Sequence, residues 1–295
     1  MIFTRKAQNK TALTPMLGIF ITIFVNNIIN FFAMIIRHFT FDPVPVNSTG
    51  IMFFILAGVC NSLIGRSLLF ICISMLGAAK AGLTKATVPV FALLGGVFVL
   101  GERLDRWSWL GISVVLFGLF LMSIHAAHSD SKKLSESAIL DKTKKRAEQL
   151  YLFKGVAIGL GATFFLGSGN VFRKAGITEV PDIVLSVFVS SLFAMIVCVL
   201  VLLVLRKGRD MLYAIKNIEF NYIMSGVFAS AAIYTLVNAF RLIPVSIANP
   251  ISATEPLFTI LFVWLLKEGK KENLGIHTLI YGLIMVFGTI ILIMK

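Results

Sequence analysis

Two charged side chains, Arg66 and Glu255, lie deep inside apolar stretches of the chain. A charge at the centre of a bilayer costs at least about 2.5–3.5 kcal/mol on insertion scales, so such a side chain usually faces a cavity or a partner. On helices, Arg66 would share a face with Ser62, and Glu255 would continue a stripe of Asn249 and Ser252. Both are therefore candidates for contact with a substrate or a proton. The alternatives are a structural ion pair and, for Glu255, a carboxyl group that stays protonated.

Polar residues at helical spacing in other apolar stretches add further candidates. Asn170 follows Thr163 on one predicted helical face, and Asn238 follows Tyr234 on another. Small and amide side chains also mediate ordinary helix packing in membranes, but together such stripes favour a central polar cavity. Lys85 lies about 9 Å inside its predicted helix at 1.5 Å per residue, where it could meet an anionic substrate or extend to the membrane interface. A further stripe consists of Thr22, Asn26 and Asn30.

Three prolines interrupt the same apolar stretches. Pro89 and Pro256 stand at matching places in the two halves of the chain, and Pro250 precedes Pro256. Each lacks a backbone donor and leaves the carbonyl four residues earlier without its usual partner. Proline-interrupted segments in corresponding positions of two halves point to a binding site at mid-membrane depth, although a packing kink is the alternative.

Positioning these residues requires long apolar helices, and the composition predicts them. Of 295 residues, 58% are hydrophobic and 14% charged, and the mean hydropathy is +0.92, whereas soluble proteins carry about 25% charged residues. The sequence therefore predicts an all-α membrane protein and excludes a soluble enzyme or a nucleic-acid-binding domain. At about 20 residues per membrane helix, nine spans are predicted at 15–36, 51–76, 79–101, 107–126, 155–172, 183–205, 221–240, 245–266 and 274–294.

The net charge of +13 comes from lysines and arginines in the predicted loops. Most of them fall on one side of the membrane, with Arg173 and Lys174 assigned to the other side. The positive-inside rule then explains the charge by orientation in a lipid bilayer, with no nucleic acid as partner.

The chain shows no signature of catalysis or of a metal site. Cys60, Cys72 and Cys198 all fall inside apolar spans and are expected to be small packing residues. His125 and His128 have no cluster of further ligands beside them. Neither a zinc-protease motif nor a nucleotide-binding loop is present, so we expect no cofactor, no enzyme activity and, if the protein transports, secondary or facilitated transport.

The two halves of the chain repeat each other. When the sequence is shifted by 167 residues, the segment 83–100 falls on 250–267, with Ala86 on Ala253, Thr87 on Thr254 and Pro89 on Pro256. A polar, charged segment divides the repeats and is long enough for a short surface helix. The predicted domains are a first repeat at 1–126, a basic linker at 127–153 and a second repeat at 154–295.

The repeated segments resemble those of a known family. GAAKAGLTKATVPVFALLGGVFVLGERLDRWSWLGISVVLFGLFLM at 77–122 and SIANPISATEPLFTILFVWLLKEG at 246–269 are similar to the EamA repeat of the drug/metabolite transporter superfamily. The resemblance implies two inverted repeats, here four plus five helices, with the first helix of the ten-helix pattern missing. It also implies a permease for small metabolites.

These observations predict a secondary transporter or exporter of a small metabolite that works by alternating access around a polar cavity at mid-membrane depth. We expect a multi-pass protein of the plasma membrane, which in bacteria is the inner membrane. Formation of a homodimer is a further prediction. The alternative is a truncated or partner-dependent membrane protein without transport activity of its own. An intramembrane enzyme is disfavoured, because Glu255 is the only acid within an apolar span.

Overall fold

The computed structural model describes residues 15–40, 42, 44–76, 81, 84–135, 142–254 and 276–294, and within these ranges it contains helices and no strands. Each of the nine predicted spans contains at least one helix, so the prediction of an all-α membrane protein is confirmed. The helices are α2 (Pro15–Thr40), α3 (Ser48–Ala57), the π-helix η1 (Gly58–Gly65), α4 (Arg66–Leu76), α6 (Val88–Phe98), α7 (Arg106–Ser135), α8 (Lys142–Glu179), α9 (Ile183–Val204), α10 (Gly208–Lys216), α11 (Phe220–Leu242), α12 (Val245–Ser252) and α14 (Ile276–Ile293).

Five helical segments of the described chain are long and apolar enough to cross a membrane. A hydrocarbon core about 30 Å thick needs about 20 helical residues, and these segments have 22 to 29. Shorter apolar helices lie at Val88–Phe98, Arg106–Leu121 and Ile280–Ile293. The five long segments are Leu17–Thr40, Ser48–Ile73, Tyr151–Glu179, Ile183–Val204 and Phe220–Leu242.

The predicted linker at 127–153 does not form a separate surface helix in its described parts. Helix α7 continues through the start of the linker to Ser135, and α8 begins at Lys142, so the linker extends the two flanking helices. Residues 136–141 lie outside the described chain.

The helices group into two compact units, each of which draws on both halves of the sequence. Unit 1 lies within Met1–Phe70 and Ser168–Ile243, and unit 2 within Ile71–Gly167 and Pro244–Lys295. Helices α4 and α8 contribute to both units, because the division falls inside them. The units therefore do not coincide with the two predicted repeats, which stay a prediction.

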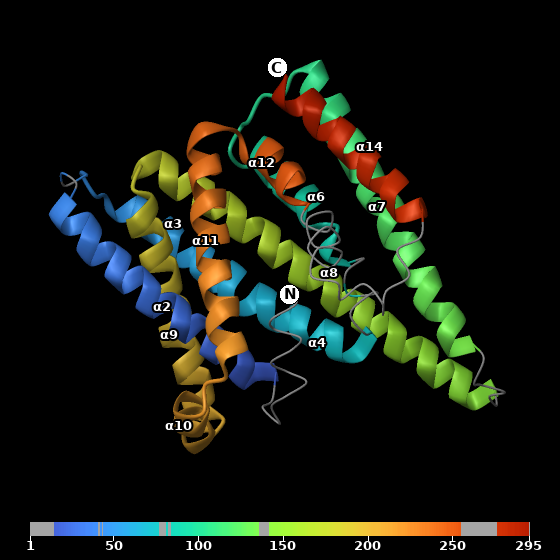
Figure 1. Ribbon diagram of the computed structural model, residues 1–295, viewed down its shortest axis with the longest axis horizontal. Coiled ribbons are helices and arrows are strands. Elements are labelled where there is room, and N and C mark those ends of the chain that lie inside the picture. The colour runs from blue at the N-terminus through green and yellow to red at the C-terminus, as the bar shows by residue number, and fades with distance from the viewer. Residues whose placement is uncertain are drawn as a thin grey trace. The chain divides into compact units, whose positions relative to one another are not determined.

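Unit 1 is built around α2, which lies beside α9 and α11 (Figure 1). Its apolar core joins residues from α2, α9, α10 and α11. The short helix α10 completes this core by burying Ala214. The buried members are Leu17, Phe20, Ile21, Val25, Cys198, Leu202, Ala214 and Tyr222. Cys198 of this core and Cys72 of unit 2 are buried, as expected for packing residues, whereas Cys60 in η1 is half-buried; no disulfide joins the three.

Unit 2 is dominated by the antiparallel pair α7 and α14, which run side by side (Figure 1). Glycines allow this close approach: a Cβ at Gly288 would lie 2.8 Å from the backbone nitrogen of Val115 and 3.0 Å from the carbonyl oxygen of Gly111. A Cβ at Gly118 would lie 2.7 Å from Met285. Small residues at helix interfaces are the usual means of packing helices in a membrane.

The prolines act differently at the two places that the structure describes. The span at 79–101 turns at Ala86–Thr87, and Pro89 stands in the first turn of α6, where the missing N–H needs no partner. Pro89 therefore begins a helix instead of kinking one. Pro250 does lie inside a helix, α12, which ends two residues later at Ser252. Pro256 lies outside the described residues.

Candidate functional site

A π-helix interrupts the second membrane span just before its charged residue. Eight residues, Gly58–Gly65, form η1, and Arg66 follows as the first residue of α4. Gly58 packs directly on α9, since a Cβ there would lie 2.1 Å from the carbonyl oxygen of Ser190. A π-helical turn is wider than an α-turn, so it rotates the residues after it relative to those before it. Such turns inside α-helices are frequent at functional sites, and here the turn directly precedes Arg66.

Helix α8 packs antiparallel against α3 and η1 and carries the second half of the site. Gly176 lies against Phe54, and Gly169 lies against Asn61, where an added Cβ would approach the Asn61 Cβ to 2.6 Å. Phe172, which lies between the two glycines on α8, stacks on Phe53 of α3 with ring centroids 6.4 Å apart. The close packing places the face of α8 between Gly169 and Gly176 against the π-helical stretch.

An amide pair fixes this packing. The Asn61 Nδ2 group donates a hydrogen bond of 2.9 Å to Asn170 Oδ1. Asn170 is 5% exposed, so the predicted candidate is buried and bonded to a neighbouring helix. Arg173 stands three residues later on the same face of α8.

Arg173 is the functional candidate that sequence reasoning missed. It was assigned to a loop, yet it lies within α8 and its side chain is 2% exposed. Its Nε and Nη1 atoms have no hydrogen-bond partner among the described residues. Arg66, which is half-buried, follows Asn61 by five residues, as Arg173 follows Asn170 by three. Both arginines of unit 1 thus lie about one helical turn from the Asn61–Asn170 hydrogen bond that joins their helices. The available signal was the spacing of Arg173 from Asn170, three residues on the predicted polar face.

The polar stripe predicted on α2 makes hydrogen bonds to neighbouring helices. Ser230 Oγ donates to Asn26 Oδ1 at 3.0 Å, and Asn30 Nδ2 donates to Ser191 Oγ at 2.8 Å. These bonds tie α2 to α11 and α9, so two members of the predicted stripe mediate helix packing. Asn238 is exposed on α11.

Two further cations of unit 1 stabilise helix ends. Arg37 forms an ion pair of 2.8 Å with Asp182, whose side chain also caps α9 by accepting from the Leu185 amide at 3.0 Å. Lys174 donates to the carbonyl oxygens of Phe240 and, at 3.1 Å, Ile243, at the end of α11. Cations at a helix C-terminus are favourable because the last carbonyls lack intrahelical partners. Lys174 therefore has a structural role, unlike its neighbour Arg173.

Unit 2 contains the remaining described candidates. Asn249 is 2% exposed and donates to the Val245 carbonyl at 3.1 Å, while Ser252 is exposed and donates to the Asn249 carbonyl at 2.8 Å. Lys85 is half-buried. Glu255 lies outside the described residues, as does Pro256, so the predicted stripe can be followed only as far as Ser252.

The start of α12 is closed by a carboxylate. Glu102 accepts hydrogen bonds from the backbone amides of Val245 and Ser246, at 2.7 and 3.0 Å, and from the Ser246 hydroxyl. A helix N-terminus attracts anions through its unpaired amides and dipole. Because Glu102 already fills this position, the first turn of α12 is not open to an anionic ligand.

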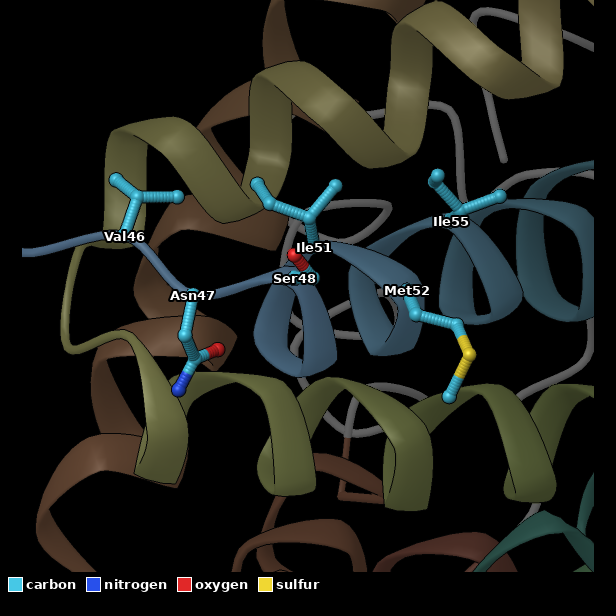
Figure 2. A pocket seen from close by; sticks show the side chains of 6 residues that line it. All are labelled: Val46, Asn47, Ser48, Ile51, Met52 and Ile55. Carbon is cyan, nitrogen blue, oxygen red and sulfur yellow. The ribbon is translucent and has the colours of Figure 1, made fainter.

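A shallow hollow lies along α3. It has a volume of about 330 Å³ and is lined by residues of a single segment, 46–55. Figure 2 shows Val46, Ile51 and Ile55 pointing to one side and Asn47 and Met52 to the other. Its lining contains no charged residue, and neither arginine of the candidate site reaches it. The arginines therefore stay the candidate functional site. Among the described residues, no group of three His, Cys, Asp or Glu side chains could hold a metal ion.

The comparisons with known proteins concern most of the chain. A model of the EamA-like transporter family matches residues 1–124 and 153–294. No curated protein matches the sequence. One solved structure, "Crystal structure of protein", is 14% identical, and the match covers 99% of this chain and 93% of the other with a TM-score of 0.69. At this identity the likeness shows the fold alone.

Proposed function

Because the chain belongs to the EamA-like transporter family, we propose that it is a secondary transporter of a small metabolite. In this proposal it resides in the plasma membrane, a bacterial inner membrane, and works by alternating access around a polar site at mid-membrane depth. The family match and the long apolar helices make it a multi-pass membrane protein. The sequence has no phosphate-binding loop of the GxxxxGK[ST] type to bind ATP, which favours a secondary mechanism.

One observation supports the proposal above all others: two arginines lie inside unit 1 on helices of membrane-spanning length. Arg66 belongs to the segment Ser48–Ile73, and Arg173 belongs to Tyr151–Glu179. Charges in such segments are rare and mark substrate or ion pathways by default. The π-helix before Arg66 supports the same interpretation, because interrupted helices supply binding groups at mid-membrane depth in many transporters.

Reconstituted vesicles test the proposal directly. Purified protein is placed in lipid vesicles that are preloaded with unlabelled metabolites of one class, and uptake of the labelled metabolite is measured. We expect protein-dependent exchange for at least one class, without ATP. Exchange is expected to fail in Arg66→Gln and to persist in Arg206→Gln, which removes an exposed arginine at the end of α9. Folded, vesicle-inserted protein that exchanges no class would favour the alternative, a partner-dependent protein without its own transport activity.

That Glu255 couples transport to a proton gradient stays a prediction. Glutamine resembles the protonated acid and cannot titrate. In the coupling hypothesis, Glu255→Gln loses accumulation driven by a pH gradient and keeps exchange. Wild-type accumulation in this variant would exclude Glu255 as the coupling residue. Homodimer formation likewise remains a prediction, which the mass of the purified protein in detergent tests.

A further inference from the structure

We propose that Arg66 and Arg173 bind the oxyanion group, a carboxylate or a phosphate, of the transported molecule, so that the substrate is a small anion. This inference rests on the proposed function and names its substrate class. The observation behind it is that Arg173, 2% exposed, has unpartnered Nε and Nη1 atoms among the described residues. Its helix is joined by the Asn61–Asn170 hydrogen bond to the segment that carries Arg66.

Charge balance is the first argument. Among the described residues of unit 1, the ion pair found is that of Arg37 with Asp182, and it involves neither Arg66 nor Arg173. A buried positive charge is strongly unfavourable without a counter-ion. Lysine could lose its proton in such a place, but arginine stays charged under physiological conditions. The site therefore requires a negative charge that these parts of unit 1 do not supply.

The described carboxylates of unit 1 are placed elsewhere. Asp182 is already engaged by Arg37 and by the first turn of α9. The others stand at or next to helix ends, where Glu179 accepts from Asn47 and Glu219 accepts from Asn221. These carboxylates are Asp42, Glu179, Asp210 and Glu219.

Donor chemistry is the second argument. A guanidinium group presents a planar set of N–H donors that matches carboxylate and phosphate oxygens, and such charge-assisted hydrogen bonds are among the strongest in proteins. Two of the three nitrogens of Arg173 lack an acceptor. A neutral ligand could satisfy these donors, but it would leave the two positive charges unbalanced. An oxyanion satisfies both requirements.

Local structure is the third argument, because it holds the two arginines in place without neutralising them. The Asn61–Asn170 hydrogen bond joins η1 to α8, five residues before Arg66 on one side and three before Arg173 on the other. Gly169 and Gly176 let the helices approach closely on either side of Arg173. The site is thus formed by rigid helices, which is the arrangement that keeps binding groups oriented before the ligand arrives.

Binding to the purified protein in detergent tests the proposal. The unfolding midpoint is measured at constant ionic strength with two anions, succinate and inorganic phosphate, and with the neutral succinamide and the cationic butane-1,4-diamine. We expect a saturable rise with at least one anion and none with the other two probes. Succinate alone would identify a carboxylate ligand, and phosphate alone a phosphorylated one. Stabilisation by neither anion, or equal stabilisation by succinamide, would overturn the proposal.

Three variants assign the effect to the site. Losing a charged hydrogen-bonding group should weaken anion binding at least about tenfold in Arg173→Gln and in Arg66→Gln. Lys174→Gln is the matched control: it removes the adjacent cation, which caps α11, so we expect a lower midpoint with unchanged anion affinity. Should Arg173→Gln fail to fold, Arg173→Lys keeps the charge and loses the planar fork, and weaker binding is again expected. Wild-type affinity in the arginine variants would contradict the proposal.

If Arg173 had only a structural role, replacing it would lower the unfolding midpoint of the ligand-free protein. If the ligand-free protein holds an uncompensated charge, Arg173→Met should raise its unfolding midpoint while anion stabilisation disappears. A lower midpoint for Arg173→Met would overturn the proposal. Failure of the proposed function can be told apart from failure of the anion site. Vesicles that exchange only neutral or cationic metabolites refute the anion site alone. Anion binding without any exchange refutes transport alone.

Discussion

The two units of the molecule satisfy their buried polar groups to different degrees. In unit 1, atoms of Asn30, Arg173, Ser186, Tyr222 and Tyr234 are buried without a hydrogen-bond partner, whereas none is found among the described residues of unit 2. Unit 2 instead matches the carboxylate of Glu102 with three donors and packs α7 against α14 through glycines.

The unpartnered buried groups of unit 1 have a cost in stability. Unmatched buried donors and acceptors each cost about 1–3 kcal/mol, so their concentration in unit 1 lowers stability there. Proteins tolerate such costs where a ligand later supplies the missing partner. Unit 2 has the properties of a packed scaffold, whereas unit 1 holds the buried donors of the proposed anion site. The contrast predicts where substitutions destabilise most.

The largest expected effect comes from breaking the carboxylate site in unit 2. Glu102→Ala leaves three donors of α12 without their charged acceptor, and we expect the free energy of unfolding to fall by about 3 kcal/mol. Unfolding of the purified protein in detergent measures it. Glu179→Ala is the control in unit 1: its exposed carboxylate accepts from Asn47 at 2.9 Å, and its loss should cost about 0.5 kcal/mol. Equal losses would break the comparison.

An intermediate effect is expected from the glycine contact of α7 and α14. Gly288→Ala places a methyl group 2.8 Å from the Val115 nitrogen, and backbone atoms cannot move aside as a side chain can. We expect a loss of about 2 kcal/mol in the same measurement. Gly208→Ala serves as control, because its nearest neighbour would be Leu203 Cδ2 at 3.5 Å. If both variants are neutral, close packing does not stabilise unit 2.

The smallest effect sharpens the description of unit 1. A double-mutant cycle with Asn26→Ala and Ser230→Ala isolates the bond between α2 and α11. Side-chain hydrogen bonds between membrane helices average about 0.6 kcal/mol in such cycles, and we expect a coupling of that size. A coupling above about 2 kcal/mol would mean that polar contacts stabilise unit 1 as strongly as Glu102 stabilises unit 2.

The sequence predicted the helices well because long apolar runs have few other structures in a membrane. It also made Arg66 a candidate, since a single charge in an apolar run stands out, and its role stays a prediction. Arg173 was missed for the converse reason: the predicted span ended at residue 172, and a basic pair after an apolar run is typical of a loop. Helix α8 continues to Glu179 because its end packs against α3.

Partners and local distortions were beyond the sequence. Asn26 and Asn30 were correctly placed on one helical face, but spacing does not tell whether a face meets a cavity or another helix. The π-helix had no sequence signal of its own, and its first residue, Gly58, packs against Ser190 of a helix distant in sequence. Pro89 was expected within a helix, and the turn at Ala86–Thr87 moved it to a helix start.

The interleaved composition of the units has a consequence for biosynthesis. Asn30 and Asn26 enter the membrane early, but their partners Ser191 and Ser230 follow 161 and 204 residues later. At 5–20 residues per second, the longer interval lasts roughly 10–40 s. During that time the amides of α2 must be shielded by the insertion machinery or by water at its edge. Co-expression of the chain as two pieces, cut within residues 136–141, would therefore test whether neither piece accumulates alone while both accumulate together.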